Sequence, residues 1–223
     1  MLRQKIAAAN TESPQVAEQL VVYQTYIDSN GNTVRVPNKN AMYTTTTVDY
    51  LMDNGYGHVE GQISNADVEA FRQIIHKMPK HFKMVELGSL YGASAVTFTL
   101  LAYEMGKTCD IMCIDVFAIP GQLETFLRNT MDFSNITHRA EIFTSHFAYD
   151  GEPIDLYFDD ASHMERPTYK QLVYWSQYAK NIAVHDYIAE WEGNIAAVDR
   201  FASERAVTVQ QFAESSVVFM ENL

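Results

Sequence analysis

Apolar residues follow two different spacings that alternate along most of the chain. Val68, Phe71, Ile74 and Ile75 recur at intervals of three and four residues, which is typical of a helix with one buried face. Apolar runs such as 111–114 are too short for helices, and they predict buried strands. The pattern therefore predicts strands and helices in alternation.

The predicted elements share this alternation from about residue 60 onward. The predicted strands are 82–87, 108–116, 139–144, 154–158 and 181–184, and the predicted helices are 64–78, 93–105, 122–131, 167–178 and 190–204. Two last strands, 206–212 and 216–220, flank a short turn and predict an antiparallel hairpin. Such an order favours a parallel sheet with helices on both faces, and mixed sheets accept an antiparallel edge. We therefore expect an α/β, Rossmann-like, doubly wound sheet that is mostly parallel and seven-stranded, with an antiparallel C-terminal hairpin.

The first 60 residues do not continue this alternation. A short helical pattern at 14–20 precedes two extended segments, 21–27 and 33–36, which flank the turn-forming residues 28–32. We expect residues 1–60 to form an N-terminal arm or lid close to the substrate, and residues 61–223 to form one α/β domain.

Composition and charge restrict the classes of partner. A chain of 223 residues with 47% hydrophobic and 20% charged residues is typical of a globular protein with one sizeable core. The formal net charge of −12 argues against a nucleic acid or an anionic membrane as the main partner. We expect a small-molecule partner, and a homo-oligomer is compatible with the sequence.

Cysteine spacing and hydropathy favour a cytoplasmic protein. Cys109 and Cys113 lie on one predicted strand, which does not make a disulfide framework. No signal-peptide pattern is visible at the N-terminus, and no apolar run reaches about 18 residues. We therefore expect a soluble protein in the cytoplasm.

The stretch 85–94 (Val-Glu-Leu-Gly-Ser-Leu-Tyr-Gly-Ala-Ser) predicts a nucleotide-like ligand site. A strand ends near Glu86, and Gly88 and Gly92 then allow tight turns or a close approach to a ligand. The following helix presents unpaired N–H groups at its N-terminus. Residue 90 is leucine, so the Gly-x-Gly-x-x-Gly fingerprint of nicotinamide enzymes is absent.

Polar residues stand where four of the predicted parallel strands end. They are Glu86, Asp115, Asp159-Asp160 and His185-Asp186. Open α/β sheets bind ligands at the carboxyl ends of their strands. Asp115 can accept hydrogen bonds from both hydroxyls of a ribose, or it can cap the following turn.

The segment 159–163 (Asp-Asp-Ala-Ser-His) combines carboxylates with a histidine. Together with His185-Asp186 it can hold a divalent cation, or His163 can take a proton from a substrate hydroxyl. A third interpretation is that Asp160 or Ser162 only caps the next helix. Ser145 can meet the edge of an adenine ring or serve as an ordinary turn serine.

Four segments together resemble class I S-adenosylmethionine-dependent methyltransferases: 85–94, 114–116, 156–163 and 184–187. The resemblance is strongest to small-molecule O-methyltransferases, which include the macrolide sugar O-methyltransferases, and to the cephalosporin-hydroxylase-like group. It covers roughly residues 60–220. Ala161 stands where the family has glycine, and His185 stands where several relatives have a carboxylate.

The resemblance implies a role for each matching residue. The cofactor, S-adenosylmethionine, would be bound by Glu86, Gly88, Ser89, Tyr91, Gly92, Ser94, Asp115, Val116 and Ser145. His163 would be the general base with Asp160 beside it, and Asp160 and Asp186 would be Mg²⁺ ligands. His185 is a further candidate ligand because it stands at the next strand end. The domain at 61–223 would then be the methyltransferase domain.

These expectations predict O-methylation of a small-molecule or sugar hydroxyl. Because the sulfonium methyl is already activated, such an enzyme chiefly aligns donor and acceptor and removes the hydroxyl proton. A bound Mg²⁺ would lower the pKa of that hydroxyl. Two alternatives stay open: an NAD(P)-dependent Rossmann oxidoreductase and a non-catalytic cofactor-binding relative.

Overall fold

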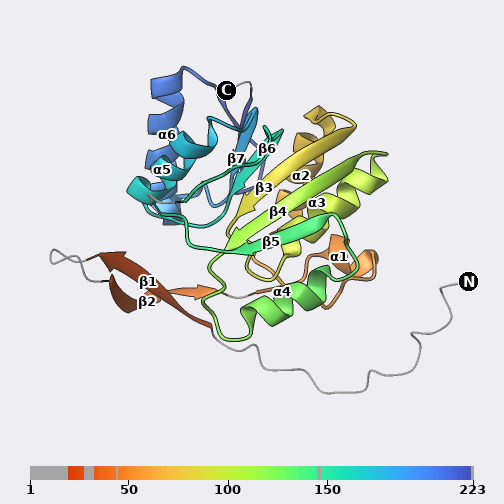
Figure 1. Cartoon of the computed structure of the whole chain (residues 1–223), viewed down its shortest axis with the longest axis horizontal. Coiled ribbons are helices and arrows are strands. Elements are labelled where there is room, and N and C mark those ends of the chain that lie inside the picture. Colours follow the sequence, from red (N-terminus) through yellow and green to blue (C-terminus); the bar gives the residue numbers. More distant parts are fainter. Residues whose placement is uncertain (1–19, 28–32, 44, 145–146, 222–223) are drawn as a thin grey trace, which may run out of the picture. The chain divides into compact units, whose positions relative to one another are not determined.

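The computed structural model describes residues 20–27, 33–43, 45–144 and 147–221, which fall into two compact units divided between Thr45 and Thr46. In the first unit, β1 (Leu20–Ile27) and β2 (Thr33–Tyr43) pair antiparallel (Figure 1). Both strands were predicted, although β2 continues past residue 36. The predicted turn at 28–32 and residues 14–19 of the predicted helical pattern 14–20 lie outside the described residues, and Leu20 begins β1.

The second unit contains a seven-stranded sheet with the order β5-β4-β3-β6-β7-β9-β8. Its strands are β3 (His81–Leu87), β4 (Thr108–Asp115), β5 (Ile136–Ala140), β6 (Leu156–Asp159), β7 (Asn181–Val184), β8 (Val209–Gln211) and β9 (Val218–Glu221). The first five in this order are parallel, and β9 pairs antiparallel with both β7 and β8. The predicted fold class is confirmed.

Helices cover both faces of this sheet (Figure 1). They are α1 (Asp49–Asp53), α2 (Asn65–Lys77), α3 (Ala93–Glu104), α4 (Gln122–Thr130), α5 (Glu165–Trp175) and α6 (Glu192–Arg205), with a 3₁₀ turn at Ala189–Trp191. None of the described helices combines the length and the apolar character that a membrane span requires.

Successive residues of the strands point into two separate cores. Met84 joins the core beneath α2 and α3, and Val85 joins the core beneath α5 and α6, as the two-residue period of a strand requires. In the first core, the rings of Phe71 and Phe98 stack with centroids 4.3 Å apart. In the second, Trp175 of α5 stacks on Tyr157 of β6 at 5.1 Å. The helices packed on both faces of the sheet hold the carboxyl ends of the strands in place.

The largest departure from the predicted elements concerns β5. The prediction placed this strand at 139–144, whereas it spans Ile136–Ala140. It is the edge strand of the sheet and is only partly buried, so it lacks the apolar run that marks the inner strands. Between β5 and β6 the described residues, 141–144 and 147–155, form no helix, so the predicted alternation is interrupted there.

The start of α2 follows the sequence closely. The Ser64 side chain accepts a hydrogen bond from the Asp67 backbone N–H at 3.1 Å, and the Asp67 carboxylate accepts one from the Ser64 backbone N–H at 2.8 Å. This reciprocal capping box satisfies two N–H groups that the helix itself leaves unpaired.

Candidate functional site at the carboxyl edge of the sheet

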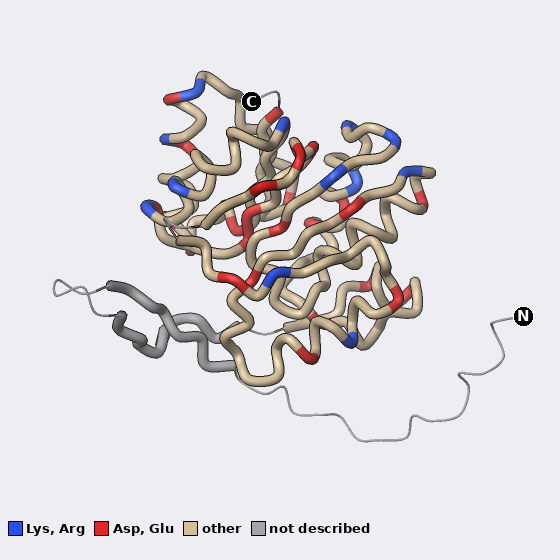
Figure 2. Tube along the Cα trace, in the orientation of Figure 1, with Lys and Arg blue, Asp and Glu red and all other residues tan. Residues whose placement is uncertain are grey.

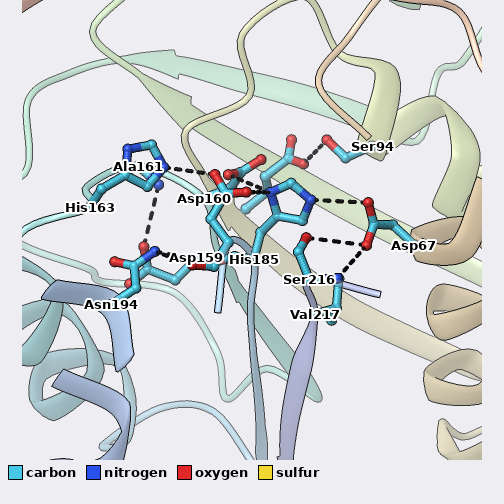
Figure 3. Close-up of polar contacts among 12 residues, drawn as sticks. Asp67, Ser94, Asp159, Asp160, Ala161, His163, His185, Asn194, Ser216 and Val217 are labelled. Atoms are coloured by element: carbon cyan, nitrogen blue, oxygen red, sulfur yellow. Dashed lines mark hydrogen bonds and ion pairs between the residues drawn. The ribbon is translucent and has the colours of Figure 1, made fainter. Parts of the chain in front are cut away.

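The polar strand ends meet at one edge of the sheet, as the sequence predicted. Leu87 of β3 pairs with Ile114 of β4 and with Asp159 of β6, and Asp159 pairs with Val184 of β7. The residues that follow these positions therefore converge, and Figure 3 shows several of their side chains in contact.

The turn after β3 packs directly against the end of β6. Gly88 has a φ of +87°, and a Cβ atom at this position would lie 2.7 Å from the Cα of Ala161 and closer still to the carbonyl oxygen of Asp160. Only glycine fits this combination of conformation and backbone contact. Gly92, with a φ of +89°, then precedes the first residue of α3. The two glycines expected at the ligand site thus shape the turn.

Asp115 holds this turn through backbone N–H groups. One carboxylate oxygen accepts hydrogen bonds from the N–H groups of Ser89 and Leu90, both at 2.9 Å, and the other accepts one from Phe117 at 2.8 Å. A carboxylate offers about four acceptor positions, so one is left for a ligand. Asp115 therefore anchors the turns after β3 and β4, which is close to the capping interpretation of this residue.

Glu86 lies beneath the turn with no exposed surface. Its carboxylate accepts hydrogen bonds from the hydroxyl of Ser94 and from the thiol of Cys113, whose sulfur lies 3.2 Å from the oxygen. Burial raises the pKa of Glu86 to about 7, although the hydrogen bonds from Ser94 and Cys113 act in the opposite direction. Glu86 is thus a buried acid that stays partly protonated near neutral pH.

Substitution of Glu86 by glutamine is expected to flatten the pH dependence of stability. The folded pKa of about 7 lies above the ordinary value of 4.5, so the native state holds this proton more tightly and loses stability as pH rises between the two values. For the wild-type protein, this lowers the free energy of unfolding at pH 8 by on the order of 3 kcal/mol relative to pH 4. Glu86→Gln should abolish this contribution. Urea unfolding at several pH values measures the free energy of unfolding of both proteins. The same dependence of this free energy on pH in the two proteins would contradict the burial argument. Asp159, whose pKa is also raised to about 7 by burial, leaves a residual slope.

Of the remaining residues expected at the cofactor, Tyr91 belongs to the turn after β3 and Val116 follows β4. The Tyr91 carbonyl accepts a hydrogen bond from Asn129 of α4 at 2.9 Å. Val116 is 49% exposed beyond the end of β4. Ser145 lies outside the described residues.

A histidine–carboxylate pair occupies the edge beside β6 and β7. His163 Nε2 lies 2.8 Å from a carboxylate oxygen of Asp186, and the His163 ring stacks on Trp191 with centroids 4.1 Å apart. Helix α5 begins after Met164 without a side-chain cap, so Asp160 is not used to cap it. A histidine that a carboxylate orients in this way can serve as a general base.

His185 is buried between three carboxylates (Figure 3). Its Nδ1 lies 3.1 Å from Asp160 and 3.4 Å from Asp186, and its Nε2 lies 3.4 Å from Asp67. Burial alone would lower the pKa of His185, but these carboxylates outweigh it and raise the pKa well above its usual range. His185 is therefore a buried cation with both ring nitrogens engaged.

The pKa of Asp186 responds to both histidines. Burial alone would raise it, but hydrogen bonds from His163 and His185 hold it below its usual range. Asp186 also has a left-handed φ of +59°, which is uncommon for a residue other than glycine. Its carboxylate is thus ionised and shared between the two rings.

The donor atoms do not fit the Mg²⁺ that the resemblance implies. Asp160, His163 and Asp186 offer ligand atoms within 4.8 Å of one another, but Mg²⁺ prefers an octahedron of oxygen ligands. One of the three groups supplies nitrogen, and the carboxylates of Asp160 and Asp186 already lie against His185 Nδ1, at 3.1 and 3.4 Å. His185, whose nitrogens both face carboxylates, has no lone pair to offer a metal.

Asn194 was missed by the sequence analysis. It is buried in α6 and donates to the His185 carbonyl at 3.1 Å, and its Oδ1 lies 3.1 Å from the Thr168 hydroxyl. Thr168 in turn donates to the Ser162 carbonyl at 2.7 Å, so Asn194 ties the loop after β6 to the loop after β7. The signal that could have revealed it is an asparagine next to the apolar stripe of a helix, where asparagine is unfavourable unless it is hydrogen-bonded.

Comparison with known proteins bears on the fold. No protein-family model matches the chain, and no curated protein matches its sequence. A putative rRNA-methylase from Clostridium thermocellum is similar in structure, with a TM-score of 0.56, 13% identity, and coverage of 72% of this chain and 97% of that chain. The precorrin-6y C5,15-methyltransferase from Geobacter metallireducens gives a TM-score of 0.51, 14% identity, and coverage of 69% and 84%.

In a third similar structure, the match covers a smaller share of the other chain. It is M. capricolum TrmK in complex with S-adenosyl-homocysteine, with a TM-score of 0.48, 10% identity, and coverage of 69% of this chain. The match spans 66% of the TrmK chain. The two structures with TM-scores above 0.5 share the fold of the region that they match. The chain therefore has a Rossmann-like methyltransferase fold.

Proposed function

We propose that this protein is an S-adenosylmethionine-dependent methyltransferase that methylates a hydroxyl group of a small molecule. The observation that carries the proposal is the His163–Asp186 pair at the carboxyl edge of a methyltransferase fold, near the turn at residues 88–92. The contact between Gly88 and the backbone of Asp160 and Ala161 brings that turn next to the loop that carries His163.

The turn at 88–92 is the proposed donor site. Asp115 already holds its backbone in place, so little ordering is needed when a ligand binds. The remaining acceptor position of Asp115 would receive a ribose hydroxyl, and the methionine part would lie over Gly88 and Ser89. The donor supplies a methyl group that is activated by attachment to sulfonium sulfur.

His163 is the proposed general base. When its Nε2–H donates to Asp186, the lone pair of the neutral ring lies on Nδ1, which takes the proton from the acceptor hydroxyl. The hydroxyl oxygen forms its bond to the methyl carbon as the carbon–sulfur bond breaks, and sulfur keeps the electron pair. Asp186 stabilises the imidazolium that results.

Charge favours a small acceptor over RNA. The similar structures are named for rRNA and for precorrin, so the fold alone does not choose the acceptor. The chain carries 28 acidic against 16 basic residues, and among the described residues of the second unit Lys and Arg are spread over several elements (Figure 2). This distribution disfavours a polyanion.

Calorimetry with S-adenosylhomocysteine and, separately, with NAD tests the donor site. We expect the homocysteine nucleoside to bind and NAD not to bind. Asp115→Asn should weaken binding at least about tenfold, because a hydrogen bond to a charged group contributes about 1.5–3 kcal/mol. Asp110→Asn, at an exposed position of the same strand, is the matched control. Binding of NAD without the homocysteine nucleoside would contradict the proposal.

A further inference from the structure

The carboxylate of Asp67 gathers hydrogen bonds from three segments that are far apart in the chain. Ser64 donates through its backbone N–H and its hydroxyl, both at 2.8 Å. Ser215 donates through its hydroxyl at 2.7 Å, and Ser216 donates through its N–H at 3.0 Å and its hydroxyl at 3.2 Å. His185 Nε2 completes the set at 3.4 Å. Asp67 is only 3% exposed, so this carboxylate is rigidly fixed in the interior.

This arrangement dictates the state of the His185 ring. A neutral imidazole has a single N–H, so one of its nitrogens would point a lone pair at a carboxylate. Nε2 of His185 faces Asp67, and Nδ1 faces Asp160 and Asp186; because an ionised carboxylate can only accept, N–H donors on both nitrogens match this arrangement. Asp67 therefore determines the orientation of the ring from the side opposite Asp160 and Asp186.

The other side of the ring faces the proposed base. His185 Nδ1 lies 3.1 Å from one oxygen of Asp160 and 3.4 Å from one oxygen of Asp186. The second oxygen of Asp186 accepts from His163 at 2.8 Å. Two neighbouring carboxylates repel each other unless a cation lies between them, and His185 is that cation.

We propose that Asp67 is a positioning residue of the active site, which orients His185 and thereby holds Asp186 in the place where it orients His163. The role of this group in catalysis rests on the proposed function, whereas the coupling of Asp67 to His163 through His185 and Asp186 is a property of the free protein. The role goes beyond the capping box, because a cap at α2 would need only the contacts with Ser64.

Nuclear magnetic resonance of the histidine rings in the free protein tests this coupling. The variant Asp67→Asn keeps the shape of the side chain and removes its charge. We expect the ring nitrogen signals of both His185 and His163 to shift, even though His163 has no hydrogen bond to Asp67. Ser215→Ala is the matched control, because it removes one donor from the carboxylate oxygen of Asp67 that does not face His185. We expect it to leave the His163 signals in place.

Thermal unfolding establishes that each variant is folded, and both variants should lower Tm. A folded Asp67→Asn protein with unmoved His163 signals would overturn the proposal. If Asp67→Asn does not fold, the wild-type spectrum decides: both ring nitrogens of His185 should carry slowly exchanging protons, and a neutral tautomer would overturn the proposal.

Binding of S-adenosylhomocysteine separates this inference from the proposed function. The dissociation constant of S-adenosylhomocysteine for Asp67→Asn should lie within twofold of the wild-type value, because Asp67 does not touch the turn at 88–92. A wild-type protein that fails to bind the homocysteine nucleoside would refute the methyltransferase proposal, while the coupling of His163 to Asp67 would still be measurable.

Discussion

Replacement of Gly88 by alanine is expected to destabilise the protein by about 4 kcal/mol. The left-handed φ of +87° costs about 1–2 kcal/mol for a residue with a Cβ. The Cβ would also overlap the backbone of Asp160 and Ala161, and such overpacking typically costs about 1–3 kcal/mol more. Urea unfolding of the two proteins measures the difference.

Gly55 provides the matched control for this substitution. Its φ of +88° is nearly identical, but a Cβ there would meet no atom within 4 Å. Gly55→Ala should therefore cost only about 1–2 kcal/mol. An equal decrease in the free energy of unfolding for the two variants would show that backbone conformation alone explains the glycine at position 88, and not the contact between the loops after β3 and β6. The clash should also displace Asp160, so Gly88→Ala should weaken donor binding, whereas Gly55→Ala should not.

Substitution of His163 by glutamine is expected to slow methyl transfer about 10²–10⁴-fold, the usual contribution of a general base. Glutamine keeps a donor for Asp186 but cannot accept the hydroxyl proton. Transfer of a radiolabelled methyl group from S-adenosylmethionine to a panel of sugars and phenols measures the rate. The dissociation constant of S-adenosylhomocysteine should change less than twofold, because the substitution leaves the turn at 88–92 intact.

His76→Gln is the control for the loss of a histidine, since His76 is exposed in the last turn of α2. It should leave the rate unchanged. An unaltered rate of methyl transfer in His163→Gln would show that another group takes the proton of the acceptor hydroxyl. Donor binding without any methyl transfer by the wild-type protein across the panel would favour the non-catalytic alternative.

Local patterns predicted the inner part of the fold well. The helical spacing of Val68, Phe71 and Ile74 and the capping pair Ser64 and Asp67 placed α2 correctly, because both depend on neighbours within a few residues. The inner strands were recognisable because they are buried on both faces. The edge strand β5 was displaced in the prediction, since its apolar signal is weak where the sheet ends.

Asp115 shows how far a residue type predicts a role. The sequence placed it correctly at the end of β4, beside the turn after β3. Its use as an anchor for the N–H groups of Ser89 and Leu90 depends on the direction of backbone groups, which no side-chain pattern encodes. The same limit applies to His185, which the sequence offered as a metal ligand and the fold surrounds with carboxylates.

By itself, the sequence determined the order and type of most elements and the set of polar residues at the strand ends, because both follow from short-range periodicity and from the geometry of parallel sheets. Only the tertiary structure decided the partners of those residues. Asp67 and His185 are 118 positions apart, and their contact requires α2, β7 and the turn before β9 to be packed together. Charge state and proton location depend on that packing, since burial and neighbouring charges determine the pKa of a side chain.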